Sequence, residues 1–137
     1  MKIDLLLERQ VTAIACEQIR AADGSLAVLR PFSQICGSMI APVAARLLQN
    51  VEGGKGILLG GTPVPPLEVV IIGAGIVGSS AVQAFLAMGA HVTVIDRDLS
   101  ALQRIYERFP GVVTMVSISR NIERAVAYAD VVVGAVL

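Results

Sequence analysis

The chain has 137 residues, which is the size of about one domain. Hydrophobic residues make up 55% and charged residues 16%, so the composition is globular and excludes a disordered chain. Eleven basic residues balance eleven acidic ones, and no basic run with interleaved aromatic residues occurs. We therefore expect no nucleic-acid partner.

The uncharged segment 69–90 has about the length that crosses a bilayer. It contains four glycines and changes its periodicity partway, which indicates a strand followed by a helix, not a membrane span. No signal peptide is predicted, because Asp4 and Glu8 interrupt the N-terminal apolar run. Cys16 and Cys36 have no metal-binding spacing, and His91 cannot complete a metal site with them. We expect buried free thiols in a reducing cytoplasm and no metal.

The first half of the chain predicts a few separate elements. Pro31 introduces Ser33 as the N-cap of a helix that runs to Asn50 and that Pro42 can kink. The other expected elements are the end of a helix over 3–9, a short strand over 11–15, a turn over 22–25, a loop over 53–56, a strand over 57–59 and a stiff connector over 62–66.

The second half alternates strictly between strands and helices. We expect strands over 69–72, 91–95, 112–116 and 131–135, with helices over 76–88, 99–109 and 122–128. The strands are apolar throughout, as in a parallel sheet that is covered on both faces. The pattern predicts an α/β fold with three layers.

A glycine motif of the form GxGxxG follows the first of these strands and opens the first helix. Its residues are Gly73, Ala74, Gly75, Ile76, Val77 and Gly78. The first glycine allows a tight turn, the second allows close approach of a diphosphate, and the third lets the helix lie close to the sheet. The bare N–H groups of the helix start form an anion site that needs no basic side chain. We therefore predict a Rossmann-type, doubly wound domain with strand order 3-2-1-4 that binds a dinucleotide.

Asp96 comes immediately after the second expected strand, where a carboxylate accepts hydrogen bonds from the adenosine ribose hydroxyls. The same charge repels a 2′-phosphate, which favours NAD over NADP as the cofactor. Arg97 beside it is a residue type that can accommodate a 2′-phosphate or stack on adenine, so NADP stays open. The alternative role for Asp96 is a helix cap, although Asp98 or Ser100 is better placed to cap the following helix.

Read together, these segments resemble the alanine dehydrogenase family and its relative, the NAD-binding subunit of nicotinamide nucleotide transhydrogenase. The resemblance rests on the segments 11–17, 31–34, 53–61, 64–66, 73–78, 88–97 and 129–137. It implies NAD(H) as the cofactor, L-alanine and pyruvate as substrates of the intact enzyme, and a homo-oligomer. It also implies cofactor contacts from Ser33, Val77, Gly78, Asp96, Ser117, Ala135, Val136 and Leu137. Ser33 is also a candidate for a simple cap, Ser117 for an ordinary strand-end serine, and Val136 and Leu137 for core residues.

The chain departs from the family pattern where catalysis is concerned. The resemblance places the family's catalytic lysine and histidine upstream of the matching segment and its catalytic aspartate downstream. None of Lys2, Lys55 and His91 sits in a motif that matches these catalytic residues. We therefore expect a segment that binds cofactor without turnover. Residues 1–30 would be a remnant of the substrate domain, and residues 31–137 an NAD-binding domain truncated at its C-terminal end.

Two other functions remain open at this point. A transhydrogenase subunit would pass hydride to another nucleotide-binding subunit, and a downstream transmembrane region in the parent gene would favour it. A stop codon directly after Leu137 would support a stand-alone nucleotide-binding module without catalysis, whereas codons continuing past Leu137 and before Met1 would support a fragment.

Overall fold

The computed structural model describes residues 2–136. The chain divides into two compact units, Met1–Phe32 and Ser33–Leu137, which are described separately. Among the described residues, no helix has the length and apolar character needed to cross a membrane.

The first unit contains short local elements. Helix α1 spans Lys2–Glu8 and the 3₁₀ helix η1 spans Cys16–Gln18, so the predicted helix over 3–9 is confirmed. The predicted turn over 22–25 is also confirmed, with the Asp23 carboxylate accepting a hydrogen bond from the Ser25 N–H at 2.9 Å. The predicted strand over 11–15 is wrong. These residues are exposed, and no strand in the described part of this unit offers them a hydrogen-bonding partner.

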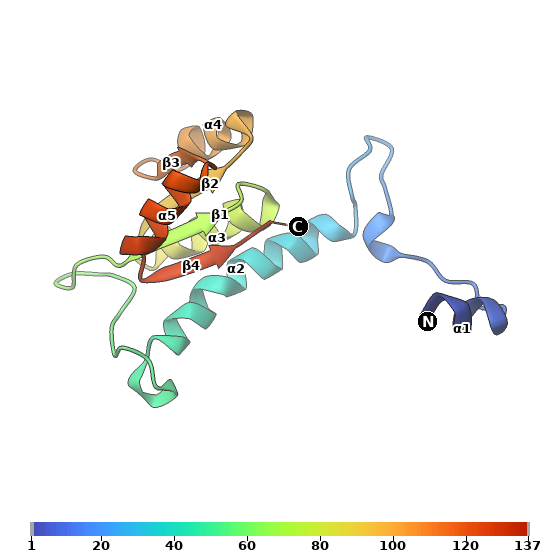
Figure 1. Cartoon of the computed structure of the whole chain (residues 1–137), viewed down its shortest axis with the longest axis horizontal. Coiled ribbons are helices and arrows are strands. Elements are labelled where there is room, and N and C mark those ends of the chain that lie inside the picture. Colours follow the sequence, from blue (N-terminus) through green and yellow to red (C-terminus); the bar gives the residue numbers. More distant parts are fainter. Residues whose placement is uncertain (1, 137) are drawn as a thin grey trace. The chain divides into compact units, whose positions relative to one another are not determined.

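The second unit is built on a four-stranded parallel sheet (Figure 1). The strands are β1 (Glu68–Ile72), β2 (His91–Asp96), β3 (Val113–Val116) and β4 (Val131–Gly134). Their order is β3-β2-β1-β4, which confirms the predicted 3-2-1-4 arrangement. Because all four strands are parallel, their carboxyl ends meet at one edge.

Helices cover both faces of this sheet, which confirms the three layers and the Rossmann-type fold. Helices α3 (Ile76–Ala87) and α4 (Leu99–Arg108) bury one core cluster against alternate strand residues such as Val69 and Ile71. Helix α5 (Ser119–Tyr128) buries Val70 and Ile95 from the opposite face. The central strands β1 and β2 are buried as predicted, whereas β3 and β4 at the sheet edges are partly exposed.

Helix α2 spans Leu29–Leu47 and is longer at its start than predicted. Ser33 lies inside this helix, so its prediction as an N-cap is wrong. Pro31 sits in the first turn, where a missing N–H costs no hydrogen bond, and therefore does not delay the helix start. Pro42 lies inside the helix.

The link from α2 to the sheet contains the 3₁₀ helix η2 (Asn50–Glu52) and irregular segments. The loop over 53–56 and the proline connector over 62–66 are confirmed. The strand predicted over 57–59 is wrong, because the side chain of Leu59 is buried in the core while its carbonyl accepts a single hydrogen bond, from the Leu67 N–H at 2.9 Å. Burial in the core, and not ladder pairing, therefore explains the apolar character of Leu59, while the neighbouring Leu58 is exposed.

Both thiols are free and exposed, so the expectation of buried cysteines is wrong. Cys36 lies on the outward side of α2, whose apolar sequence extends around the whole helix. Local hydrophobicity therefore does not reveal which face a cysteine occupies.

Candidate functional site

The glycine turn lies directly after the carboxyl end of β1, and two of its glycines are required by the fold. Gly73 has a φ of +113°, and a Cβ there would come within 2.5 Å of the Ala135 carbonyl oxygen. A Cβ on Gly78 would overlap the Gly73 carbonyl oxygen and lie 3.6 Å from a methyl carbon of Ile71. The tight turn and the close seat of α3 on the sheet therefore both depend on missing side chains.

Gly75 differs from these two glycines. Its φ is −72°, and a Cβ at this position would meet nothing within 4 Å. Neither backbone strain nor a protein neighbour therefore requires glycine here. The residue is exposed and opens α3, and no side chain caps the helix. The first-turn N–H groups are thus presented at an open surface, which is the geometry that binds a phosphate oxygen.

Asp96 ties the glycine turn to the end of β2. Its carboxylate accepts hydrogen bonds from the Ala74 N–H at 2.6 Å and from the Asp98 N–H at 2.8 Å. Each carboxylate oxygen accepts about two hydrogen bonds, so acceptor sites remain for ligand hydroxyls. Asp96 does not cap α4, because Asp98 does so by accepting from the Ser100 N–H at 2.9 Å.

The pKa of Asp96 lies below its ordinary value of 3.8. Burial is the largest influence and raises the pKa. The hydrogen bonds from the Asp98 and Ala74 N–H groups, with smaller contributions from the Arg97 backbone and charge, outweigh it. The group is therefore a carboxylate at neutral pH, an acceptor and not a donor of hydrogen bonds.

Three further candidate residues lie around the same edge. The Ser117 N–H donates to the Asp96 carbonyl at 2.9 Å, and the Ala135 N–H donates to the Ile72 carbonyl at 2.8 Å. Val136 approaches Gly73 closely enough that a Cβ there would lie 3.1 Å from its side chain. The candidate Leu137 lies outside the described residues.

Ser33 and Arg97 are placed less directly. Ser33 is half-buried and precedes Gly37 by one helical turn, so the two share a face of α2. Gly37 packs against α3, since a Cβ there would overlap the Val77 carbonyl oxygen and lie 2.6 Å from Ser80 Cβ. Arg97 is exposed beside Asp96, and its charge contributes to the lowered pKa of that carboxyl group.

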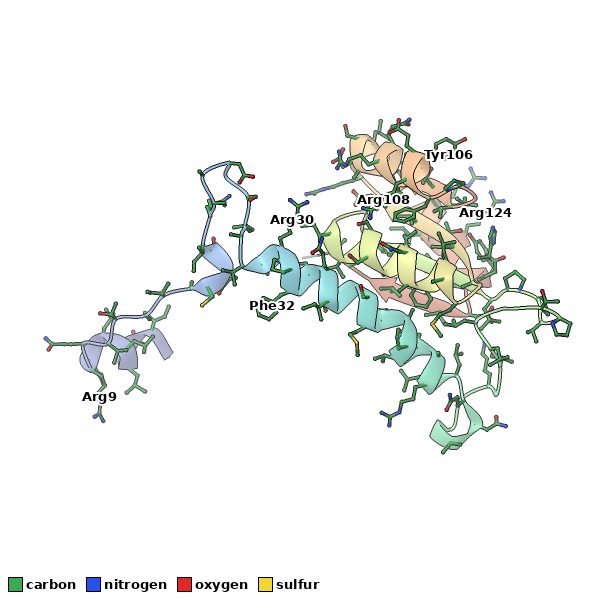
Figure 2. The ribbon with its side chains drawn as sticks, turned by 180° about the vertical axis from the view of Figure 1, so that it is seen from behind. Arg9, Arg30, Phe32, Tyr106, Arg108 and Arg124 are labelled. Carbon is green, nitrogen blue, oxygen red and sulfur yellow. The ribbon has the colours of Figure 1, made fainter. Side chains whose placement is uncertain are left out.

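A cavity of about 510 Å³ adjoins the glycine turn between α3 and α4. Its lining includes residues that the sequence did not single out, namely Ser79, Ala101, Arg104, Ile105, Glu107 and Arg108. Figure 2 shows Arg108 on this side of the molecule. Positions 101, 104, 105 and 108 could have been predicted to lie together, because their helical spacing places them on one face of α4.

Lys55 and His91 lie at the opposite edge of the sheet from the glycine turn. His91 Nδ1 lies 2.9 Å from both carboxylate oxygens of Glu68, where β2 and β1 begin. The Lys55 ammonium donates to the Asp130 carboxylate at 3.4 Å, and that carboxylate also accepts from the Glu68 N–H at 3.1 Å. These contacts join the amino ends of β1, β2 and β4, away from the glycine turn.

An uncapped helix start behind a glycine turn, with a carboxylate at the end of the neighbouring strand, defines the class of nucleotide-binding Rossmann-type proteins. Comparison with known families gives the particular family. Residues 41–137 match the model described as Alanine dehydrogenase/PNT, C-terminal domain, and the chain belongs to this family.

Curated relatives agree with this assignment. The chain is 46% identical over 134 residues to an alanine dehydrogenase of Methanococcus maripaludis, covering 96% of this chain and 36% of the relative. It is 45% identical over 136 residues to the enzyme of Mycolicibacterium smegmatis, covering 98% of this chain and 37% of the relative. The chain thus spans about a third of the length of the relatives that it matches.

Solved structures show the same fold. An L-alanine dehydrogenase matches with a TM-score of 0.89 and 39% identity, covering 98% of this chain and 38% of that one. A transhydrogenase from Sinorhizobium meliloti matches with a TM-score of 0.75 and 18% identity, covering 96% and 40%. The second likeness is one of fold alone.

Proposed function

We propose that this chain is the NAD(H)-binding part of an alanine dehydrogenase. The observation that carries the proposal is the open, uncapped start of α3 beside the Asp96 carboxylate. A Cβ at Gly75 would face empty space, so a diphosphate can approach the backbone there. The two ends of an ADP group thus have separate partners, the first-turn N–H groups for the diphosphate and Asp96 for the ribose.

NAD, and not NADP, is the expected cofactor. Asp96 is ionised at neutral pH, and its two backbone hydrogen bonds hold the carboxylate in place. A fixed negative charge at the ribose subsite repels a 2′-phosphate. Arg97 is exposed, and solvent screens its charge, so it offers only partial compensation.

We assign further cofactor contacts around the first-turn N–H groups of α3 and the Asp96 carboxylate. Gly73, Ala74, Gly75, Ile76, Val77 and Gly78 would surround the diphosphate, Ser117 would lie near the adenosine, and Ala135, Val136 and Leu137 would lie on the nicotinamide side. Ser33 would contact the cofactor from α2. When bound, NAD accepts a hydride from its substrate, and this chain's residues serve only to hold and orient it.

The whole enzyme would convert L-alanine, NAD and water to pyruvate, ammonia and NADH. The relatives' name supports this reaction. Within this chain, the lysine and histidine described above, Lys55 and His91, are paired with Asp130 and Glu68 at the amino edge of the sheet. Substrate activation would therefore come from residues of a substrate domain, of which residues 1–30 form a part, and this chain alone would not turn over.

We further propose that the protein works as a homo-oligomer in the cytoplasm. The exposed apolar residues of α2 support self-association. The free cysteines fit a reducing compartment.

Calorimetric titration of the 137-residue chain with NAD, NADP and AMP tests the proposed function. We expect NAD to bind at least tenfold more tightly than NADP, and AMP to bind weakly because it lacks the diphosphate. Equal binding of NAD and NADP would overturn the cofactor assignment. Reduction of pyruvate by NADH and ammonia on this chain alone would overturn the proposal that the catalytic residues lie outside it. Absence of NAD binding would overturn the proposed function itself.

A further inference from the structure

Within Ser33–Leu137, helix α2 turns small side chains toward the rest of the unit. This inward face carries Ser33, Gly37, Ala41 and Ala45, which follow one another every four residues. Gly37 and Ala41 are buried, whereas Ser33 and Ala45 are half-buried. The distance between two packed helices depends on the side chains at their contact, so this face lets α2 lie close to its neighbour.

The neighbour of Gly37 is helix α3, and the contact leaves no room for a side chain. A Cβ on Gly37 would overlap the Val77 carbonyl oxygen, and it would lie 2.6 Å from Ser80 Cβ and 3.1 Å from the Ala81 nitrogen. Two of these three atoms belong to the backbone of α3 and cannot turn aside. Glycine is a poor residue for the interior of a helix, so the contact with α3, and not helix formation, explains its presence here.

This contact also determines where Ser33 lies. Gly37 meets the first two turns of α3, which begins at Ile76. The two helices run side by side in the same general direction (Figures 1 and 2). Ser33 precedes Gly37 by one turn, about 6 Å along the helix axis, and therefore lies toward the start of α3. That start presents the bare N–H groups that we assign to the diphosphate.

We propose that Gly37 is a positioning residue of the cofactor site. Its missing side chain seats α2 directly on α3 and so brings the Ser33 hydroxyl to the diphosphate, to which the hydroxyl donates a hydrogen bond. The inference rests on the proposed function and explains how a residue outside the glycine turn reaches the ligand. Gly37 itself is buried between the two helices and does not touch the ligand.

A side chain at position 37 should act on one part of the site only. It would push α2 away from α3 and withdraw Ser33 from the ligand. The glycine turn and its hydrogen bond to Asp96 belong to β1, α3 and β2, so they stay in place. The expected defect is therefore the loss of one hydrogen bond to a charged phosphate, with the adenosine subsite intact.

Calorimetric titration with NAD of the wild type, Ser33→Ala, Gly37→Ala and the double variant tests the proposal. We expect each single substitution to weaken NAD binding about tenfold, because a hydrogen bond to a charged group is lost. The double variant should bind NAD no more weakly than the weaker single variant, since Gly37 acts through Ser33. Adenosine affinity, measured from amide chemical shifts, should stay within about twofold, because adenosine carries no phosphate and is held at Asp96.

Gly60→Ala is the matched control for a purely structural effect. A Cβ on Gly60 would overlap the Gly89 carbonyl oxygen, a backbone clash of the same kind that lies beyond the far end of α3. This variant should lose thermal stability and bind NAD like the wild type. Ser38→Ala controls for a change within α2, because Ser38 is exposed and its hydroxyl donates to the Gln34 carbonyl at 2.9 Å.

The outcomes separate this inference from the proposed function. A wild type that does not bind NAD overturns both. If the wild type binds NAD, then wild-type affinity in Gly37→Ala, additive losses in the double variant, or an equal loss in Gly60→Ala each overturn the role of Gly37 alone. If Gly37→Ala fails to fold by circular dichroism, Ser80→Val replaces it. This variant crowds the same contact with a side chain that can turn aside, so we expect the same non-additivity with a smaller loss of affinity.

Discussion

The carboxylate of Asp96 accepts a hydrogen bond from the Ala74 N–H at 2.6 Å, which joins the end of β2 to the glycine turn after β1. One side chain therefore shapes the diphosphate subsite and forms the ribose subsite. This link was not predicted from the sequence, where Asp96 was assigned to the ribose alone. It makes the two subsites mechanically dependent on each other.

Replacement of Asp96 by alanine should weaken NAD binding by about 1.5–3 kcal/mol, the usual contribution of hydrogen bonds to a charged group. Calorimetry measures the change. Asp98→Ala is the matched control, since it removes the cap of α4 and should cost about 1 kcal/mol of stability while leaving NAD affinity unchanged. Unchanged affinity in Asp96→Ala would refute the role of this carboxylate.

The lowered pKa of Asp96 predicts a defined pH dependence of stability. Since the folded-state pKa lies below 3.8, the carboxylate's contribution is fully present above that value. It is lost only as the pH falls further, through the folded-state pKa. The difference in free energy of unfolding between wild type and Asp96→Asn should therefore stay constant from neutral pH to about 4 and shrink below it. A difference that already declines between about pH 6 and 5 contradicts the predicted direction of the shift.

Gly78 and Gly75 should respond differently to alanine. Gly78→Ala places a Cβ against the Gly73 carbonyl, a backbone atom that cannot move aside, so it should destabilise the fold by about 1–3 kcal/mol or more. Gly75→Ala meets no protein atom and should change stability by no more than about 1 kcal/mol.

Gly75→Ala should have a small effect on stability but a large effect on NAD binding. Its added methyl group occupies the space where a diphosphate approaches, so NAD affinity should fall at least about tenfold in a folded protein. Thermal unfolding and calorimetry on the same sample check both parts. A stable Gly75→Ala variant with wild-type affinity would show that the diphosphate lies elsewhere.

Asp130→Ala tests the assignment of the opposite edge. The Asp130 carboxylate accepts from the Glu68 N–H and pairs with Lys55, so its loss should cost about 1 kcal/mol of stability. NAD affinity should not change, because this edge is distant from the glycine turn in the parallel sheet. A large loss of NAD affinity without loss of stability would place the ligand at the amino edge of the sheet and contradict its assignment to the glycine turn.

The sequence predicted the sheet and the glycine turn well because their signals are local and physical. Apolar strands and the GxGxxG spacing identify β1, α3 and β2 directly, and right-handed crossovers then give the strand order. The strands predicted over 11–15 and 57–59 failed because a β-branched or apolar run acquires strand geometry only beside a partner. Ser33 was taken for a cap because Pro31 is tolerated in a first turn as well as before it.

The parts of the site that could not be predicted depend on contacts between distant residues. The Ala74–Asp96 hydrogen bond spans 22 positions, and the close fit of Gly37 on Val77 spans 40. Neither leaves a local pattern. Likewise, only the structure shows that the face of α2 with Gly37 and Ala41 packs, while Met39 and Val43 stay exposed.

The central claim is that the bare N–H groups at the start of α3 bind a diphosphate. Amide chemical shifts of the ¹⁵N-labelled chain, recorded with ADP and with adenosine, test it most directly. We predict that ADP shifts the amides of Gly75, Ile76 and Val77 strongly, while adenosine shifts mainly those near Asp96 and Ser117. Equal shifts with both ligands, or ADP shifts confined to another part of the domain, would contradict the account.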